Sequence, residues 1–328
     1  MRALIIDRYG DPQRVLRVGE IVLPALKRGQ VLVQVAAAPV HPADIAFVNG
    51  WYGIKRPTPT VPGLEGSGTV VEANAGPYGR WLVGKRVALT APADGTGTWA
   101  EFTPCSATSC VPLPEGLETT AGAMLLANPL TAVSFIAIAR QGRHRAFIQT
   151  AAASALGQMI SRYARERGIA VINIVRRKQQ AEAMSAAGET HVLCSSDDGF
   201  ADQLKALADQ LKATLAFDAI GGQMVATLAT AMPHGGKVIQ YGGLSGEAGH
   251  VEIADLLFHG KSLEGYWVPL YLEKAGVLKR LAMAATVRRH ASTIFASKVL
   301  EKVPFEHFAA ALRLQRERAS EGKVLLVP

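Results

Sequence analysis

The stretch from Arg145 to Lys178 decides the fold, and it reads RAFIQTAAASALGQMISRYARERGIAVINIVRRK. Two continuous apolar runs, residues 146–149 and 170–175, are typical of strands in a parallel sheet that is covered on both faces. Between them, apolar residues from Leu156 to Ala164 recur at the spacing of one buried helix face. The stretch therefore predicts a strand–helix–strand unit.

Small residues join the first of these strands to the helix, and Gly157 is placed for close packing of the helix on the strand. Such a turn lets a pyrophosphate approach free backbone N–H groups at the positive end of the helix dipole. The first two glycines of the G-x-G-x-x-G pattern are absent, and Ala155 stands where a glycine is expected. The pattern fits either a degenerate dinucleotide fingerprint or an ordinary βαβ unit.

The residues that end the second strand favour the dinucleotide interpretation. NAD-binding chains place an acidic residue about 20 residues past the glycines, where it bonds the ribose 2′-hydroxyl. This chain has Arg176, Arg177 and Lys178 there instead. Three cations at that point would neutralise the 2′-phosphate of NADP(H). The alternative is a solvated basic start to the next helix, and the position favours NADP(H).

Composition indicates a globular protein of about two domains. Of the 328 residues, 49% are hydrophobic and 19% are charged, and the net charge is +8. A basic balance suits a protein that handles polyanionic small molecules such as NADPH or coenzyme A. Nucleic acid would fit the charge too, but no basic run has interleaved aromatic residues and no zinc finger is present, so we expect no nucleic-acid partner.

The chain carries the signs of a cytoplasmic protein without a membrane span. Its cysteines, Cys105, Cys110 and Cys194, are odd in number and form no C-x-x-C pair, which favours a reducing compartment. The apolar run at the N-terminus is broken at Asp7, too early for a signal peptide. Residues 119–139 lack charge, but Asn128-Pro129 interrupts them, so we expect two short buried helices rather than a membrane span.

Two domains are predicted from the change of pattern along the chain. Residues 1–121 and 269–328 are expected to form a β-rich substrate domain, and residues 122–268 a doubly wound α/β domain. The β-rich part predicts strands at 2–7, 31–38, 68–73, 86–90 and 99–103, with a long shaped loop within 50–68. The α/β part predicts further strands at 191–194, 214–218, 236–241 and 262–268, and helices at 179–187, 200–211 and 223–231. Beyond it we expect helices at 272–289 and 306–319, the second burying Phe308, Ala309 and Leu312, and a closing strand at 323–327.

Two glycine pairs follow predicted strands of the α/β domain, Gly221-Gly222 and Gly242-Gly243. Ligands of open α/β sheets bind outside the carboxyl ends of the strands, so both pairs lie at the expected edge, although each alone is also an ordinary turn. The chain has no H-E-x-x-H, no G-x-S-x-G and no cysteine–histidine cluster with zinc spacing. His41 before Pro42 has no thiol nearby, and we interpret it as structural. The sequence predicts no metal.

A nicotinamide cofactor without a metal suits hydride addition to a carbon that is already activated by conjugation. Hydride delivered to the β-carbon of an enone or enoyl thioester leaves an enolate, which needs a proton at its α-carbon. A tyrosine, with an ordinary pKa near 10, is protonated at neutral pH and can supply that proton. The candidate is Tyr52, in NGWYG (49–53) on the long loop. The alternative is that Trp51 and Tyr52 only line a pocket or fill a gap.

Taken together, these motifs resemble the zinc-independent medium-chain dehydrogenases/reductases, and within them the mitochondrial-type 2-enoyl thioester reductases and quinone oxidoreductase-like proteins. QTAAASALGQ (149–158) is similar to that reductase family's QNASNSGVGQ, and INIVR (172–176) to its INVVR. YGGLS (241–245) is similar to its YGGMS, and GYW (265–267) to its GFW. Asn128-Pro129-Leu130-Thr131-Ala132 matches its N-P-x-T-A. The similarity covers nearly the whole chain.

The resemblance implies a Rossmann domain joined to a GroES-like domain, NADPH as cofactor, a small-molecule substrate and a homodimer. It places Tyr52 on the family's proton-donor tyrosine, although Gly53 stands where the family has proline, and Arg177 stands where it has an acidic residue. The cofactor-binding residues that it implies, together with those of the glycine pairs and the basic strand end, are Asn128, Thr131, Ala153, Ser154, Ala155, Leu156, Gly157, Arg176, Arg177, Lys178, Gly221, Tyr241, Gly242, Gly243, Leu244, Tyr266, Trp267, Val268 and Lys323.

Three functions remain open from the sequence. The first is NADPH-dependent reduction of an activated C=C bond, with 2-enoyl thioesters as leading substrates. The second is NADPH:quinone oxidoreduction, with Tyr52 as a wall of the site. The third, of another class, is nucleotide binding with little catalysis.

Overall fold

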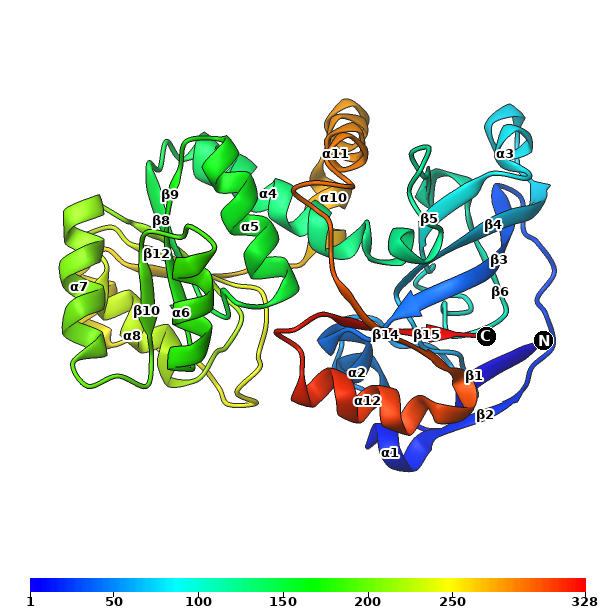
Figure 1. Cartoon of the computed structure of the whole chain (residues 1–328), viewed down its shortest axis with the longest axis horizontal. Coiled ribbons are helices and arrows are strands. Elements are labelled where there is room, and N and C mark those ends of the chain that lie inside the picture. Colours follow the sequence, from blue (N-terminus) through cyan, green and yellow to red (C-terminus); the bar gives the residue numbers. More distant parts are fainter. The chain divides into compact units, whose positions relative to one another are not determined.

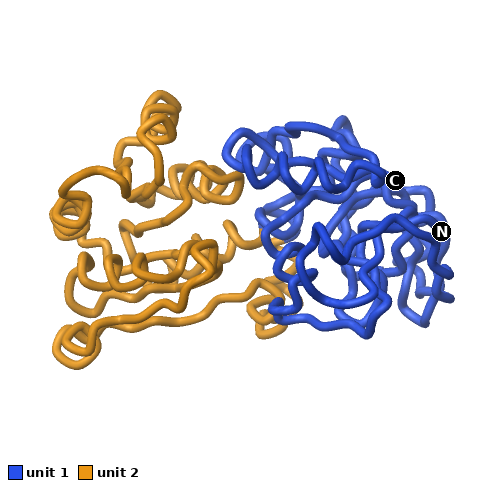
Figure 2. Tube along the Cα trace, turned by 90° about the horizontal axis from the view of Figure 1, so that it is seen from below, with its two compact units in different colours: residues 1–129, 284–328 blue, residues 130–283 orange.

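The computed structural model describes residues 1–328, and these residues divide into two compact units (Figure 2). Unit 1 contains residues 1–129 and 284–328, and unit 2 contains residues 130–283. Most helices and strands of both units are labelled in Figure 1. Because both chain termini belong to unit 1, segments from the two ends of the sequence can share one sheet there.

Unit 2 is built on a six-stranded sheet. Its strands are β8 (Ala146–Gln149), β9 (Ala170–Val175), β10 (Val192–Cys194), β11 (Leu215–Asp218), β12 (Lys237–Gln240) and β13 (Ser262–Gly265). They pair in parallel in the order β10-β9-β8-β11-β12-β13, which is that of a doubly wound dinucleotide-binding sheet. The predicted doubly wound sheet is confirmed, and its order reverses between β8 and β11.

Helices alternate with these strands, as the change of pattern predicts. They are α5 (Ala155–Glu166), α6 (Lys178–Ala186), α7 (Phe200–Leu211), α8 (Gln223–Ala231), α9 (Ile253–His259) and α10 (Val268–Lys274). Two further helices, α4 (Ala127–Gln141) and α11 (Val277–Arg289), have residues in both units. Leu204 of α7 and Leu228 of α8 are fully buried in one cluster with Ile148 and Ile172 of the sheet, so these helices cover one of its faces.

Unit 1 is β-rich, in agreement with the GroES-like expectation. Its strands are β1 (Arg2–Ile6), β2 (Leu16–Glu20), β3 (Gln30–Pro39), β4 (Glu65–Asn74), β5 (Arg86–Thr90), β6 (Phe102–Ser106), β7 (Cys110–Pro112), β14 (Val299–Pro304) and β15 (Lys323–Val327). Its short helices are α1 (Pro12–Val15), α2 (Pro42–Asn49), α3 (Pro77–Leu82), α12 (Phe308–Glu317) and the 3₁₀ turns Ala107–Ser109, Thr120–Met124 and Phe305–His307. One sheet runs β14-β15-β3-β4-β5-β7, and β6 also pairs with β3.

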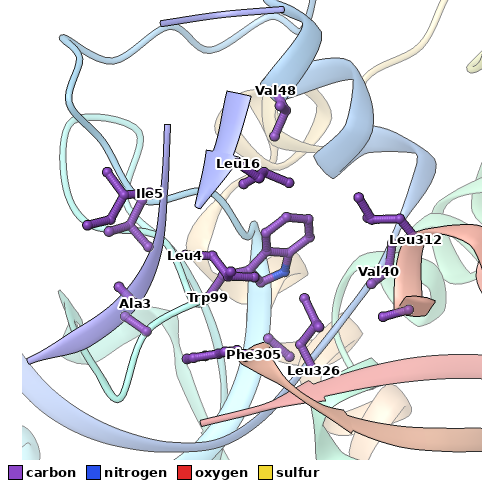
Figure 3. Close-up of a cluster of buried hydrophobic side chains, with 14 of the residues drawn as sticks. Ala3, Leu4, Ile5, Leu16, Val40, Val48, Trp99, Phe305, Leu312 and Leu326 are labelled. Carbon is purple, nitrogen blue, oxygen red and sulfur yellow. The ribbon is translucent and has the colours of Figure 1, made fainter. Parts of the chain in front are cut away.

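The core of unit 1 joins both ends of the chain. Trp99 is fully buried and packs with Leu4 near the N-terminus and with Phe305 and Leu326 near the C-terminus (Figure 3). Removing a large aromatic side chain from such a core costs about 3–5 kcal/mol. The strand pairing agrees, because Leu325 and Leu326 of β15 lie beside Pro39 and Ala38 of β3. The C-terminal strand is therefore an integral part of this unit.

The apolar stretch 119–139 differs from its prediction. The chain breaks at residues 125–126, between the 3₁₀ turn Thr120–Met124 and α4, and not at Asn128-Pro129. Pro129 lies in the first turn of α4, where a backbone N–H has no helical partner to lose. No helix of the chain combines the length and the apolar character needed to cross a bilayer.

Other boundaries, and the buried face of one helix, also differ from the predictions. The last strand of unit 2 ends at Gly265, and α10 begins at Val268 with Pro269 in its first turn, where a strand to residue 268 was expected. The single helix expected at 272–289 is divided between α10 and α11. The strand expected at 99–103 is β6, at Phe102–Ser106, and Trp99 precedes it in the core. In α12 the buried residues are Ala311, Leu312 and Gln315, so Ala309, expected inside, is exposed.

Candidate active site

The loop that follows β8 is shaped to receive an anion at the start of α5. Ser154 caps the helix by accepting the N–H of Gly157 at 3.1 Å. The N–H groups of Ala155 and Leu156, in the first helical turn, have no carbonyl of the helix to bond. Gly157 is required here, because a Cβ atom at this position would lie 2.5 Å from the carbonyl oxygen of Ala152. The helix and the loop therefore pack closely and leave donors for a phosphate.

A buried carboxylate fixes the loop after β11, next to the point where the strand order reverses. Asp218 accepts the hydroxyl proton of Thr150 at 2.7 Å and the N–H groups of Ile220 at 3.1 Å and Gly221 at 2.7 Å. Burial raises the pKa of Asp218, and these hydrogen bonds partly offset that rise. Gly221 has a φ of 79°, which favours glycine. Neither Thr150 nor Asp218 was predicted, although an acid before a glycine pair at a strand end is a usable signal.

Arg176, Arg177 and Lys178 lie exposed at the carboxyl end of β9. The Arg177 N–H is capped by the Gln180 side chain at 3.2 Å, so α6 begins directly after the strand. Lys178 approaches Asp197 at 3.5 Å, whereas no carboxylate lies within ion-pair distance of Arg176 or Arg177. Two guanidinium groups are thus free to meet an anion at this edge.

Aromatic residues of the predicted cofactor site, Tyr241 and Tyr266, follow the ends of β12 and β13. Tyr266 lies 2.5 Å from the Ser134 hydroxyl and also bonds Thr131, and burial raises its pKa. Its ring meets Phe135 edge-on at 4.8 Å between centroids, and Tyr241 does the same at 5.0 Å. The turn after β12 is close-packed at Gly242, whereas Gly243 is half-buried, Leu244 is exposed, and Trp267 and Val268 are half-buried at the start of α10.

In unit 1, Tyr52 lies on a shaped loop, residues 51–64, that follows α2. Its backbone N–H donates to the carbonyl of Ala46 at 3.2 Å, and its half-buried side chain packs on the apolar core. Gly50 ends α2 in the left-handed region with a φ of 85°. Arg56, which is 4% exposed, fastens the loop through carbonyl oxygens at 2.8 Å (Val61) and 2.7 Å (Pro92). The backbone of Tyr52 is thus fixed to α2, and the hydrogen bonds of Arg56 hold the rest of the loop in place.

Unit 1 also contains a buried charged cluster, formed by His41 directly before α2, Asp44 of α2, Glu65 of β4 and Lys323 of β15. Each of these side chains is at most 6% exposed. Burial raises the pKa of Asp44 to about 6, and burial lowers the pKa of Lys323 to about 8 although Asp44 and Glu65 oppose it. Asn128, half-buried in the first turn of α4, follows Ala127, whose N–H donates to Glu65 at 2.8 Å. Of the predicted residues, Lys323 belongs to this cluster, and Asn128 directly follows a residue that is bonded to it.

The charged cluster does not fit a zinc ion. Glu65 binds His41 with one carboxylate oxygen and two backbone N–H groups with the other. Both oxygens of Asp44 also accept backbone N–H groups. Cys105 and Cys110 lie together in a separate apolar core, and no group of three or more His, Cys, Asp or Glu side chains is arranged to hold a metal.

We expect alkaline pH to stabilise unit 1 through Lys323. Between pH 8 and 10.5 the unfolded chain holds a proton on this lysine that the folded chain has released, so the free energy of unfolding should rise with pH. The expected rise is about 1.4 kcal/mol per pH unit, and Lys323→Met should remove it. Urea unfolding at pH 8.5 and 9.5 measures the slope, with Lys302→Met on the surface of β14 as control. Equal slopes in wild type and Lys323→Met would contradict the expectation.

Two family models match the chain in succession. The alcohol dehydrogenase GroES-like domain matches residues 27–115, and the zinc-binding dehydrogenase family matches residues 155–283. The mitochondrial enoyl-acyl-carrier-protein reductase of Xenopus tropicalis is 27% identical, over 99% of this chain and 95% of its own length. The human enzyme of the same name is also 27% identical, over 82% of this chain and 72% of its own.

Solved structures agree with the sequence relatives. A protein named as an NADPH:quinone reductase from Mesorhizobium loti is 30% identical, with a TM-score of 0.93 over 100% of this chain and 98% of its own. The mitochondrial 2-enoyl thioester reductase heterodimer from Candida tropicalis, 20% identical, shows the same fold with a TM-score of 0.82 over 100% of this chain and 99% of its own. Together with the doubly wound sheet and the β-rich unit, these matches show that the chain belongs to the medium-chain dehydrogenase/reductase superfamily.

Proposed function

We propose that the chain is an NADPH-dependent reductase that delivers hydride to the β-carbon of an activated C=C bond, a 2-enoyl thioester or an enone. The observation that carries the cofactor is the exposed Arg176-Arg177-Lys178 at the end of β9, where NAD-binding sheets have an acid. The free N–H groups of Ala155 and Leu156 fit the pyrophosphate of the same dinucleotide. The names of the relatives, enoyl reductases and an NADPH:quinone reductase, support this class of reaction.

Different residues at the carboxyl edge of the unit 2 sheet would bind different portions of the cofactor. Arg176 and Arg177 would meet the 2′-phosphate, with Lys178 beside them. Residues 153–157 and the loop that Asp218 holds would surround the pyrophosphate, and the turn 241–244 and residues 266–268 would lie along the remainder. Asn128 would lie beside the nicotinamide, as the family resemblance implies, and Thr131 and Lys323 complete the proposed set. When bound, reduced nicotinamide supplies the hydride.

Tyr52 is proposed to supply the proton that completes the reduction. Hydride addition at the β-carbon leaves negative charge on the α-carbon and the thioester oxygen, and the phenolic hydroxyl of Tyr52 transfers its proton to the α-carbon. General acids of this kind contribute about 10²- to 10⁴-fold to the rate. The loop 51–64 keeps the tyrosine backbone fixed to α2, and the packing of the side chain on the apolar core reduces the ordering that proton transfer would require.

A second candidate, NADPH:quinone oxidoreduction, is favoured by the Mesorhizobium loti structure, which is 30% identical. The two reactions are separated by following NADPH oxidation with a medium-chain 2-enoyl-CoA and with a naphthoquinone. Turnover of the thioester supports the first reaction, and turnover of the quinone alone supports the second. Tight NADPH binding without turnover of either would leave a nucleotide-binding protein with little catalysis.

We also propose that the chain forms a homodimer through unit 2. β13 is an edge strand of its sheet, and Leu263 on it is 38% exposed. The neighbouring α9 exposes Ile253 at 71%, Leu257 at 69% and Phe258 at 73%. An exposed apolar face beside an open sheet edge is typical of an interface. A cytoplasmic location stays a prediction, because the enoyl reductase relatives are named as mitochondrial.

Sedimentation velocity tests the dimer. The wild-type chain should sediment at twice its mass of 34.8 kDa, and Phe258→Glu should shift it to the monomer because the charge would be desolvated at the interface. Trp81→Glu, on the exposed surface of α3 in unit 1, is the matched control and should stay dimeric. A monomeric wild type, or a Phe258→Glu variant that remains dimeric, would contradict the proposed interface.

A further inference from the structure

Glu65 links a buried histidine to the first turn of α4. Its carboxylate is 1% exposed, and Oε1 lies 2.5 Å from Nε2 of His41. The other oxygen, Oε2, accepts the N–H groups of Leu126 at 3.1 Å and Ala127 at 2.8 Å. One side chain of β4 therefore holds both an imidazole of α2 and the backbone where α4 begins.

His41 is itself held in place by the second carboxylate of the charged cluster. Its backbone N–H donates to Oδ2 of Asp44 at 2.8 Å, and Oδ1 of Asp44 accepts the N–H of Leu64 at 2.9 Å. Leu64 directly precedes Glu65, so the two contacts close a ring between α2 and the start of β4. This ring fixes the backbone from which the His41 imidazole reaches Glu65.

The carboxylate of Glu65 is buried, so no bulk water can replace a hydrogen bond that it loses. A carboxylate at a helix N-terminus is favourable because the first N–H groups have no helical partner. A buried carboxylate that loses a donor tends to turn toward another cation. The charged groups that face Glu65 are His41 at the start of α2, Asp44 of α2 and Lys323 of β15, and Arg56 interacts electrostatically with Asp44. Without His41, Lys323 is the remaining cation close enough to draw Glu65 away from α4.

We propose that His41 is a positioning residue, which acts through Glu65 to fix the backbone of Asn128 beside the reacting end of the cofactor. The inference rests on the proposed function for the place of the nicotinamide. Asn128 directly follows Ala127, so a shift of the Glu65 carboxylate moves it with the first turn of α4. Hydride transfer is sensitive to such shifts, since a displacement of about 1 Å can cost about 100-fold in rate. Binding of the adenosine half, at the far end of the dinucleotide, should not change.

Two amide substitutions test the contact atom by atom. The amide nitrogen of Gln reaches the position of the imidazole Nε2, whereas that of Asn reaches only the position of Nδ1. Because Nε2 is the atom that touches Glu65, His41→Gln should keep kcat for enoyl-CoA within about threefold of wild type, and His41→Asn should lower it about 10- to 100-fold. The KM for the thioester and the affinity for 2′,5′-ADP, which lacks the nicotinamide, should stay unchanged in both variants.

The outcomes separate positioning from a structural role. Equal kcat in wild type, His41→Gln and His41→Asn would overturn the inference, and so would equal losses in both variants accompanied by weaker 2′,5′-ADP binding. If His41→Asn does not fold, His41→Leu gives a second test, because leucine fills a similar space and makes no hydrogen bond to Glu65, and unchanged kcat in it would also overturn the inference. A wild-type chain that binds neither NADPH nor 2′,5′-ADP would overturn the proposed function and this inference together. Nucleotide binding with only the His41 expectations failing would overturn this inference alone.

Discussion

Tyr52→Phe should lower kcat for a medium-chain 2-enoyl-CoA about 100-fold or more, because the substitution removes the proton that the α-carbon must receive and leaves the ring in place. The affinity for NADPH should not change, since the hydroxyl is not proposed to bind the cofactor. Quinone reduction should also be retained, because a quinone can take its protons from water. Steady-state kinetics with both acceptors, and a fluorescence titration of NADPH, measure the three quantities.

The control for this result is Tyr78→Phe. Tyr78 lies on α3, and its hydroxyl bonds the carbonyl oxygen of Cys110 at 3.2 Å, away from the loop 51–64. The Tyr78→Phe variant should reduce the thioester at the wild-type rate. A Tyr52→Phe variant that reduces enoyl-CoA at the wild-type rate would remove Tyr52 from the mechanism and leave it as a wall of the site.

The second large effect is expected at the end of β9. Replacing Arg176, Arg177 and Lys178 together with glutamine should raise the KM for NADPH about 100-fold, because hydrogen bonds to charged groups contribute about 1.5–3 kcal/mol each and are weakened by exposure to solvent. The KM for NADH, which has no 2′-phosphate, should change by less than about threefold. The loss should shrink at high salt, where the wild-type attraction is already screened.

A matched pair of substitutions separates this effect from general charge. Arg313→Gln with Arg316→Gln removes two exposed cations from α12 in unit 1 and should leave the KM for NADPH unchanged. If the control raised the KM as much as the triple substitution, the attraction would come from the net charge of +8 and not from a site.

Local patterns predicted the fold of unit 2 well. β8 and β9 begin and end at the predicted residues because each is a short apolar run with clear polar ends. The prediction failed where a local signal competes with an apolar run, as at residues 266–268, which are apolar but lead into α10, a helix that begins at Val268 with Pro269 in its first turn. At Pro129 the opposite error occurred. A break was predicted there, but a proline in the first turn of a helix is tolerated, and α4 continues through it.

The site was predictable where it follows strand ends and not where it depends on distant partners. The basic end of β9 and the glycine turns were visible in the sequence, because their position along a strand carries the meaning. The contacts of Thr150 with Asp218, and of His41 with Glu65 and α4, join residues 24 to 68 positions apart. No spacing rule brings such pairs together, so His41 could be interpreted only as structural, and its place in the charged cluster required the fold.

A comparison of the affinities for two nucleotide fragments tests the central claim, which is that the cations at the end of β9 bind a ribose 2′-phosphate. Isothermal titration of the wild-type chain with 2′,5′-ADP and with 5′-ADP should show the first binding about 100-fold more tightly, and the triple glutamine variant should lose this preference. Equal affinities for the two fragments in the wild-type chain would contradict the claim.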